Sequence, residues 1–261
     1  MRLAAALVLS LAILPAAELG GQGTQTGFLD RSITVAGVPY HYEVYVPANY
    51  SPAQQWPVIL FLHGAGEKGA DGLLQTSNAL GAAIRRRPAD YPAIVIFPQA
   101  PPDSSWIGVP SQIAMGALDK TLAEFRTDPD RVYLTGLSMG GNGTWYLAYS
   151  FPDRFAAVAP ICGFVTLLGG GRTYRQVVPG DSTQAFPTLA RGLGHVPIWI
   201  FHGEIDGAVP VDQSRRAAEA IRGAGGDVKY TEFPGMDHNV WDAVYSSPAF
   251  RTWLFAQRRK R

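Results

Sequence analysis

The stretch Arg131-Val-Tyr-Leu-Thr-Gly-Leu-Ser-Met-Gly-Gly-Asn-Gly-Thr-Trp145 decides the fold. Its first half is strand-like and its second half helix-like, and a G-x-S-x-G pentapeptide lies between them. In a strand-turn-helix context this pattern places the serine on a tight, strained turn at the end of a sheet. We therefore expect Ser138 to be a nucleophile. Gly136 and Gly140 should be required because a side chain at either position would collide with neighbouring backbone. The pentapeptide alone is a weak signal in a chain with 29 glycines, so its context must carry the argument.

The apolar pattern elsewhere predicts an α/β fold with a mostly parallel central sheet and helices on both faces. Apolar and polar residues alternate over 38–46, which is typical of an antiparallel hairpin half exposed to solvent. The later apolar runs are short and continuous, as in strands covered on both faces, and they lie at 58–62, 93–97, 132–134, 156–159 and 198–201. Helix-like stretches alternate with them, at about 73–86, 113–125, 140–150 and 213–222.

The composition excludes several classes of function. Charged residues make up 16% of the 261 residues and the net charge is +1, so nothing indicates nucleic-acid binding or an acidic partner. The single cysteine, Cys162, excludes an intramolecular disulfide and is most simply a small buried residue. Since no CxxC or HExxH spacing occurs, we expect neither a metal nor an organic cofactor.

The first residues resemble a targeting segment. Residues 1–17 combine an early arginine, an apolar run and a Pro-Ala-Ala end, which predicts a cleaved signal peptide and a secreted or periplasmic protein without a membrane anchor. The alternative is a buried N-terminal helix. Residues 18–27 would then be a linker or the mature N-terminus, and residues 28–261 the folded domain.

Residues 163–195 interrupt the alternation of strands and helices. They contain a run of three glycines and several turn-forming residues. A long segment without periodicity in a compact domain is often functional. We weigh equally an insertion that shapes a substrate pocket and an ordinary surface excursion.

A serine nucleophile needs a base, and the base needs an acid that fixes its tautomer. Asp206 lies in the loop after the run at 198–201, and His238 lies in the loop after the strand-like run at 228–233. Loops at the carboxyl ends of parallel strands build the sites of open α/β sheets. We therefore predict Asp206 as the acid and His238 as the base, against the alternatives of a helix-capping turn residue and a surface histidine. Asp212 is the better candidate for the helix cap.

An acyl-transfer site also needs donors for the oxyanion. The backbone N–H of Met139 should be one, because it follows the nucleophile. The second should come from the loop His63-Gly-Ala-Gly-Glu67, where the backbone of Ala65 or Gly66 can approach a substrate closely. We favour Ala65; the alternative is that these glycines merely permit a turn.

Three further residues are weaker candidates for substrate binding. Gln99 and Trp106 follow the strand-like run at 93–97, where they would line the pocket, although ordinary packing explains Trp106 equally well. Trp241 would either face the pocket or brace the loop of His238.

Taken together, these motifs resemble the α/β-hydrolase superfamily. The resemblance is to serine esterases of the polyhydroxybutyrate depolymerase, feruloyl esterase and "predicted peptidase" branch, which is similar to prolyl oligopeptidases and dienelactone hydrolases. It covers about residues 33–254 and rests on ordered motifs: Leu62-His-Gly-Ala-Gly-Glu67, Pro98-Gln99, Gly136-Leu-Ser-Met-Gly-Gly141, Ala159-Pro-Ile-Cys-Gly163, His202-Gly-x-x-Asp206 and His238. One departure is Asp237, which stands where such proteins usually have glycine. A carboxylate there would favour a protonated base.

The resemblance implies a hydrolase that cleaves carboxylic esters through an acyl-enzyme. A prolyl-oligopeptidase-type peptidase is one alternative, although 261 residues leave little room for the propeller of those enzymes. A relative that only binds a ligand is another, although such relatives usually lose a triad residue. The substrate stays open among small-molecule, polysaccharide-linked and polyester esters, and the sequence does not indicate an oligomeric state.

Overall fold

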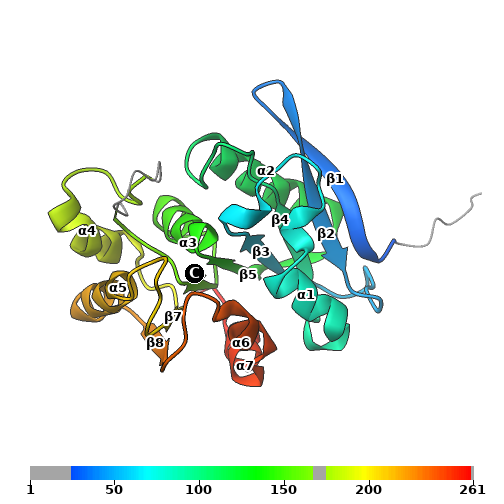
Figure 1. Ribbon diagram of the computed structural model, residues 1–261. Coiled ribbons are helices and arrows are strands. Elements are labelled where there is room, and N and C mark those ends of the chain that lie inside the picture. The colour runs from blue at the N-terminus through cyan, green and yellow to red at the C-terminus, as the bar shows by residue number, and fades with distance from the viewer. Residues whose placement is uncertain (1–24, 167–174, 260–261) are drawn as a thin grey trace, which may run out of the picture.

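The protein is built around a single eight-stranded sheet (Figure 1). The computed structural model describes residues 25–166 and 175–259, so the predicted signal peptide at 1–17 lies outside the described residues. The strands follow the order β1-β2-β4-β3-β5-β6-β7-β8. β1 pairs with β2, and β2 with β4, in antiparallel register, whereas the pairs from β4 through β8 are parallel. The predicted mostly parallel sheet with an antiparallel N-terminal hairpin is confirmed.

Strands β2 to β8 overlap the runs that the sequence predicts, whereas most of β1 lies outside them. The strands span Gly27–Val35 (β1), Val38–Val46 (β2), Trp56–Leu62 (β3), Ile94–Pro98 (β4), Thr127–Leu137 (β5), Ala157–Ile161 (β6), Ile198–Gly203 (β7) and Val228–Phe233 (β8). Every residue of β3, β4 and β6 is buried. Continuous burial of this kind follows from helices that cover both faces of a parallel sheet.

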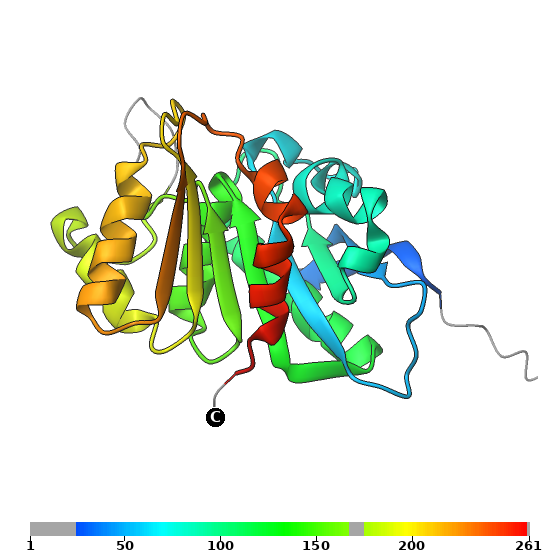
Figure 2. The ribbon, with the colours of Figure 1, turned by 90° about the horizontal axis from the view of Figure 1, so that it is seen from below.

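Within residues 25–166 and 175–259, seven α-helices divide between the two faces (Figure 1). They span Ala79–Arg86 (α1), Val109–Glu124 (α2), Met139–Ser150 (α3), Ala185–Gly192 (α4), Asp212–Gly223 (α5), Trp241–Ser246 (α6) and Pro248–Ala256 (α7). Buried side chains of α2 to α5 share one apolar core, and those of α1, α6 and α7 share the other. In Figure 2, α6 and α7 lie in front of the sheet. Among the described residues, no helix has the length and apolar character needed to cross a membrane.

The hairpin is more buried than its alternating pattern predicts. Residues 38–41 are mostly exposed, but residues 42–46 are all buried. Tyr42, Val44 and Val46 pack into the core of α2 to α5, and Tyr45 packs into the opposite core. The prediction of a half-exposed strand is therefore wrong for residues 42–46, because both faces of the sheet are covered there.

Residues 163–195 contain a helix that the sequence analysis did not predict. The described part includes α4, whose Ala185, Phe186, Leu189 and Ala190 are buried against the core, so the expected lack of periodicity is wrong there. These residues recur at helical spacing, a signal that the turn-forming residues before them obscured. Residues 167–174, with the three-glycine run, lie outside the described residues.

Candidate active site

Ser138 lies on the turn between β5 and α3. Its backbone adopts φ 53° and ψ −116°, a conformation that few side-chain-bearing residues adopt. A Cβ atom on Gly136 would lie 2.5 Å from the carbonyl oxygen of Gly140 and 2.7 Å from that of Leu62. A Cβ atom on Gly140 would overlap the same Leu62 oxygen. Main-chain contact between the turn and β3 is therefore the physical reason to expect glycine at both positions.

Ser138, His238 and Asp206 form a continuous hydrogen-bonded chain, called here the Ser–His–Asp chain. His238 Nε2 lies 2.9 Å from Ser138 Oγ, and His238 Nδ1 lies 2.6 Å from Asp206 Oδ2. The three residues follow β5, β8 and β7 at the carboxyl edge of the sheet. The ionised Asp206 carboxylate can only accept a hydrogen bond, so Nδ1 of His238 carries the proton. Nε2 of His238 is then free to accept the proton of Ser138.

The carboxylate of Asp206 has no exposed surface, yet its surroundings favour the charged form. Oδ1 accepts the backbone N–H groups of Ala208 and Val209, both at 2.8 Å. Oδ2 lies 3.1 Å from Nε2 of His202. Burial alone would raise the pKa of Asp206, but the hydrogen bonds of His202, His238 and the Val209 amide outweigh it and lower the pKa below its usual range. Asp206 therefore stays ionised beside His238.

The loop of His238 is tied to its surroundings on three sides. Asp237 Oδ1 accepts the amides of Gly207 at 2.9 Å and His238 at 2.7 Å, so the residue that departs from the usual glycine links the acid loop to the base loop. The buried Cys162 thiol donates to the His238 carbonyl at 3.2 Å. Trp241 meets the imidazole edge-on at 5.4 Å between ring centroids, as a bracing residue would. The imidazole itself is 22% exposed.

The two predicted oxyanion donors both open helical turns. Met139 is the first residue of α3, and Ala65 is the first residue of a 3₁₀ turn spanning Ala65–Glu67. The first N–H groups of a helix have no carbonyl partner within it, so both amides are free of helical bonding. They lie on the loops after β5 and β3, which are adjacent strands. This placement agrees with the oxyanion role, which stays a prediction.

Gln99 and Trp106 lie beneath the site instead of lining it. Trp106 has no exposed surface; its Nε1 donates to the His63 carbonyl at 3.0 Å, and its ring meets the His63 ring edge-on at 4.9 Å between centroids. Gln99 is 2% exposed and its amide bonds the backbone of Gly72 and Glu67. Both side chains therefore support the loop after β3. The burial of Trp106 agrees with ordinary packing, whereas Gln99 also lines a pocket of about 180 Å³ beside His41 and Gly69, and its substrate-binding role stays a prediction.

Cys162, His202 and Asp206 place three potential metal-ligand atoms within 4.8 Å of one another. The atoms do not suit an ion, because Asp206 Oδ2 and His202 Nε2 lie 3.1 Å apart and are engaged with each other. Burial and the neighbouring Asp206 carboxylate both raise the pKa of the Cys162 thiol, so it stays protonated. The cluster is a hydrogen-bond network.

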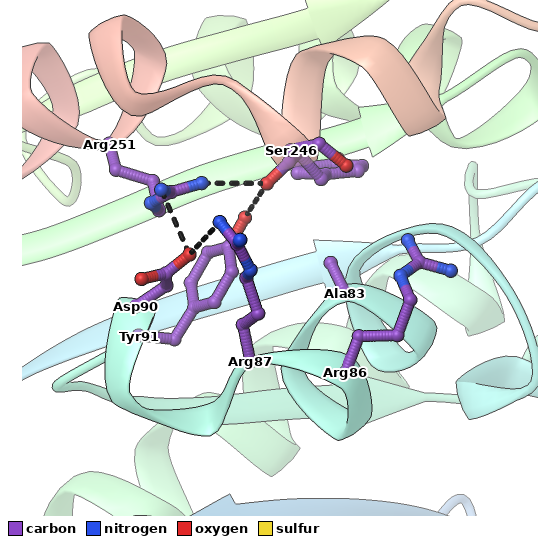
Figure 3. Close-up of a pocket in the computed structure, with 8 residues that line it drawn as sticks. Ala83, Arg86, Arg87, Asp90, Tyr91, Ser246 and Arg251 are labelled. Atoms are coloured by element: carbon purple, nitrogen blue, oxygen red, sulfur yellow. Dashed lines mark hydrogen bonds and ion pairs between the residues drawn. The ribbon is translucent and has the colours of Figure 1, made fainter.

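A pocket of about 210 Å³ lies between α1 and the α6–α7 corner and contains none of the Ser–His–Asp chain (Figure 3). Arg251 bridges Asp90 at 2.9 Å and the Tyr245 carbonyl at 3.3 Å. Tyr91 donates its hydroxyl to the same carbonyl at 2.5 Å. These contacts fasten the C-terminal helices to the segment after α1, which is a structural role.

The sequence analysis does not identify the residues that hold Asp206 and His238. His202 was noted only as part of a motif with Asp206, and Ser214, which contacts His202 at 2.7 Å, was not singled out. The one available signal was the i, i+4 spacing of His202 and Asp206, which does not identify a hydrogen bond in a loop.

Comparison with known proteins gives the family. Residues 112–256, more than half of the chain, match the prolyl oligopeptidase family. The chain is also 27% identical over 232 residues to an uncharacterized secreted protein of Arthroderma benhamiae, across 79% of this chain and 24% of that protein. It is 29% identical over 227 residues to poly(3-hydroxyalkanoate) depolymerase C of Paucimonas lemoignei, across 76% of this chain and 53% of the depolymerase. The chain thus spans between a quarter and about half of the length of these relatives.

Among solved structures, a thermostable esterase superposes with a TM-score of 0.75 at 34% identity, covering 89% of this chain and 63% of the esterase. The fold and the order of its motifs define an α/β-hydrolase, which confirms the resemblance seen in the sequence. Within that superfamily, the chain belongs to the prolyl oligopeptidase family.

Proposed function

We propose that this protein is a serine hydrolase that cleaves carboxylic esters through an acyl-enzyme. The observation that carries the proposal is the Ser–His–Asp chain, with hydrogen-bond distances of 2.9 and 2.6 Å, on a serine with φ 53°. A serine hydroxyl is a weak nucleophile at neutral pH, and an adjacent base oriented by an acid activates it.

The reaction has two half-reactions. His238 Nε2 takes the proton of Ser138 as Oγ attacks the ester carbonyl, and Asp206 stabilises the resulting imidazolium. The backbone N–H groups of Met139 and Ala65 hold the oxyanion of the tetrahedral intermediate. The imidazolium then protonates the departing alcohol, leaving an acyl-serine. Water activated by His238 attacks the acyl carbonyl and releases the acid, with no cofactor required.

The esters named in the relatives suggest where to look for the substrate. One relative is a polyester depolymerase and one structural neighbour is an esterase, which favours an ester over an amide. Small-molecule, polysaccharide-linked and polyester esters all belong to the proposal. The described part of residues 163–195 ends in α4, and we propose that this segment shapes the substrate pocket.

A peptidase activity is the second candidate, since the family is named for prolyl oligopeptidases. The same Ser–His–Asp chain would attack an amide carbonyl. The two functions differ in the leaving group, because an amine must be protonated as it departs and an alcohol leaves more easily.

We further propose that the protein is exported. The support is the signal-like sequence of residues 1–17 together with the relative named as a secreted protein. Expression of the full chain with a C-terminal tag, followed by N-terminal sequencing of the exported product, tests this. Accumulation of the tagged protein inside the cell with residues 1–17 attached would contradict it.

The central test combines labelling and turnover. Wild-type protein should react with a fluorophosphonate probe at Ser138 and hydrolyse p-nitrophenyl esters, and Ser138→Ala should lose turnover by at least about a thousandfold. Ser32→Ala, at an exposed serine in β1, is the matched control and should behave as wild type. A panel of acyl-chain lengths, aromatic acids and a proline peptide amide separates ester from amide hydrolysis. Wild-type protein that neither labels nor turns over would sink the proposal.

A further inference from the structure

His202 is a buried histidine that the proposed reaction does not yet use. It lies in β7 and has no exposed surface. Its Nε2 lies 3.1 Å from Asp206 Oδ2 and 3.0 Å from the Val209 carbonyl oxygen. Its Nδ1 lies 2.7 Å from Ser214 Oγ, on α5. Every polar atom of the ring thus has a partner.

These partners determine which ring nitrogen of His202 carries the proton. Both atoms near Nε2 are acceptors, so Nε2 must be the donor. The Ser214 hydroxyl can donate as well as accept, so it donates to an unprotonated Nδ1. A neutral Nε2–H imidazole satisfies the whole network without placing a second cation beside Asp206.

The hydrogen bond from His202 helps to fix the orientation of the Asp206 carboxylate. Its Oδ1 is held by two backbone amides, and its Oδ2 is shared between His238 at 2.6 Å and His202 at 3.1 Å. With four donors around two oxygens, the carboxylate cannot rotate away from His238. A second N–H at Oδ2 also reduces the basicity of that oxygen.

We propose that His202 is a positioning residue that acts through Asp206. Its Nε2–H fixes the carboxylate in the plane that faces His238 and keeps the proton of the imidazolium on His238 and off Asp206. The inference rests on the proposed function, because it assigns His202 a part in the same proton transfer.

Other groups face this carboxylate from the surrounding elements. The Cys162 thiol follows β6 and stays protonated. Asp237 follows β8 and is exposed, and the charge of Asp206 acts to raise the pKa of its carboxyl group, although hydrogen bonds from Gly207 and His238 lower that pKa overall. Glu232, the strand partner of His202 in β8, is paired with Arg215, and hydrogen bonds from Arg215 and Tyr230 lower its pKa to about 2. None of these groups donates a second N–H to Oδ2, so His202 supplies a contact that they do not replace.

The test compares two replacements of similar size. His202→Met removes the donor, whereas His202→Gln can place an amide N–H near the position of Nε2. On p-nitrophenyl acetate we expect His202→Met to lower kcat about 10- to 100-fold with KM within about twofold. His202→Gln should recover most of this loss.

The pH profile separates positioning from packing. Without the donor, Asp206 attracts the proton of the neighbouring imidazolium more strongly. The acidic limb of kcat/KM should therefore move up by about 0.5 to 1 pH unit in His202→Met and stay in place in His202→Gln. If the two variants lose the same activity, or neither moves the limb, His202 only fills space and the inference is wrong.

A measurement on wild-type protein covers the case in which His202→Met does not fold. With ¹⁵N-labelled histidine, NMR should show His202 as a neutral Nε2–H tautomer across the pH range in which His238 titrates. An Nδ1–H tautomer, or a His202 that titrates together with His238, would overturn the inference.

Fluorophosphonate labelling distinguishes a failure of the inference from a failure of the proposed function. A wild type that does not label rejects the proposed function and the inference with it. A wild type that labels no faster than His202→Met rejects the inference alone.

Discussion

The two sides of the candidate active site are held in different ways. On the nucleophile side, Ser138 is positioned by main chain packed against main chain, where Gly136 and Gly140 leave no space for a Cβ atom. On the other side, Asp206 and His238 sit on loops joined by side-chain hydrogen bonds. The first arrangement is rigid because it allows no alternative packing. The second depends on individual polar atoms and can be altered one atom at a time.

Asp206→Asn should give the largest effect and tests whether the acid side acts as described. An amide cannot accept from both imidazoles and two backbone N–H groups with the same strength, so His238 loses its tautomer and its counter-charge. We expect kcat to fall about 10⁴-fold while the protein stays folded. Asp212→Asn, at the exposed start of α5, is the matched control and should retain full activity. A loss below about tenfold in Asp206→Asn would show that another residue serves as the acid.

Gly140→Ala tests the nucleophile side, where main chain packs against main chain. The new Cβ atom overlaps the carbonyl oxygens of Leu62 and His63, which belong to backbone and cannot move aside cheaply. We expect the free energy of unfolding in urea to fall by about 3 kcal/mol. Gly223→Ala is the control, because a Cβ atom there meets nothing within 4 Å. If Gly140→Ala were as stable as Gly223→Ala, the close approach of the turn to β3 would be disproved.

His63 shows that the nucleophile side also contains one side-chain-dependent element. Its Nδ1 donates to the Gly64 carbonyl at 2.6 Å, and its Nε2 accepts the Ala100 amide at 2.9 Å. Burial lowers the pKa of His63 to about 4, whereas a histidine of the unfolded chain has a pKa near 6.5. As the pH falls, the imidazole is therefore protonated in the unfolded chain before it is protonated in the folded protein. Stability is therefore complete above pH 6.5 and falls as the pH drops from 6.5 to 4, by about 3 kcal/mol for this group. Urea unfolding across this window should show a weaker pH dependence in His63→Gln; an unchanged slope would exclude His63 as the cause.

Asp237 gives the smallest expected effect and refines the comparison. Its carboxylate links the acid loop to the base loop through two backbone amides. Asp237→Asn keeps an acceptor oxygen and should match wild type, whereas Asp237→Gly should lower kcat about two- to fivefold. Hydrogen exchange at Gly207 and His238 is the second readout and should rise only in Asp237→Gly. Equal behaviour of the two variants would mean that the link does not hold the loops.

The contrast between the two sides explains what could be predicted from the sequence. Ser138 and its glycines are neighbours in the chain, so a local pattern carries both their identity and their geometry. Asp206 and His238 were found from their places after strands, because parallel strands end at one edge. His202, Ser214 and Cys162 act through contacts between distant elements, and no spacing rule reports such contacts.

The same reasoning applies to the fold. Continuous apolar runs predicted the parallel strands, because a strand buried on both faces is apolar at nearly every position. Helix α4 was missed because turn-forming residues precede it, and the burial of 42–46 was missed because alternation does not reveal what covers the second face. At the end of the described residues, Arg258 and Arg259 bond Asp128 and Asp130, contacts between distant segments that the sequence pattern does not indicate. Residues 260–261 lie outside the described residues.

The position of the last helices has a consequence for how the chain is made. Residues 241–257 supply Tyr245, Phe250 and Leu254 to the core over one sheet face. The hydroxyl of Tyr133, in β5, donates a hydrogen bond to the Gln257 carbonyl at 3.0 Å. Synthesis from the ribosome therefore delivers β3 to β8 before α6 and α7, which complete, together with α1, the cover on that side. Until about residue 257 has emerged, the nascent chain carries an open apolar face of the kind that aggregates or binds chaperones. A stop codon that removed α7 would keep the whole Ser–His–Asp chain in the sequence and still leave a protein that cannot close its core.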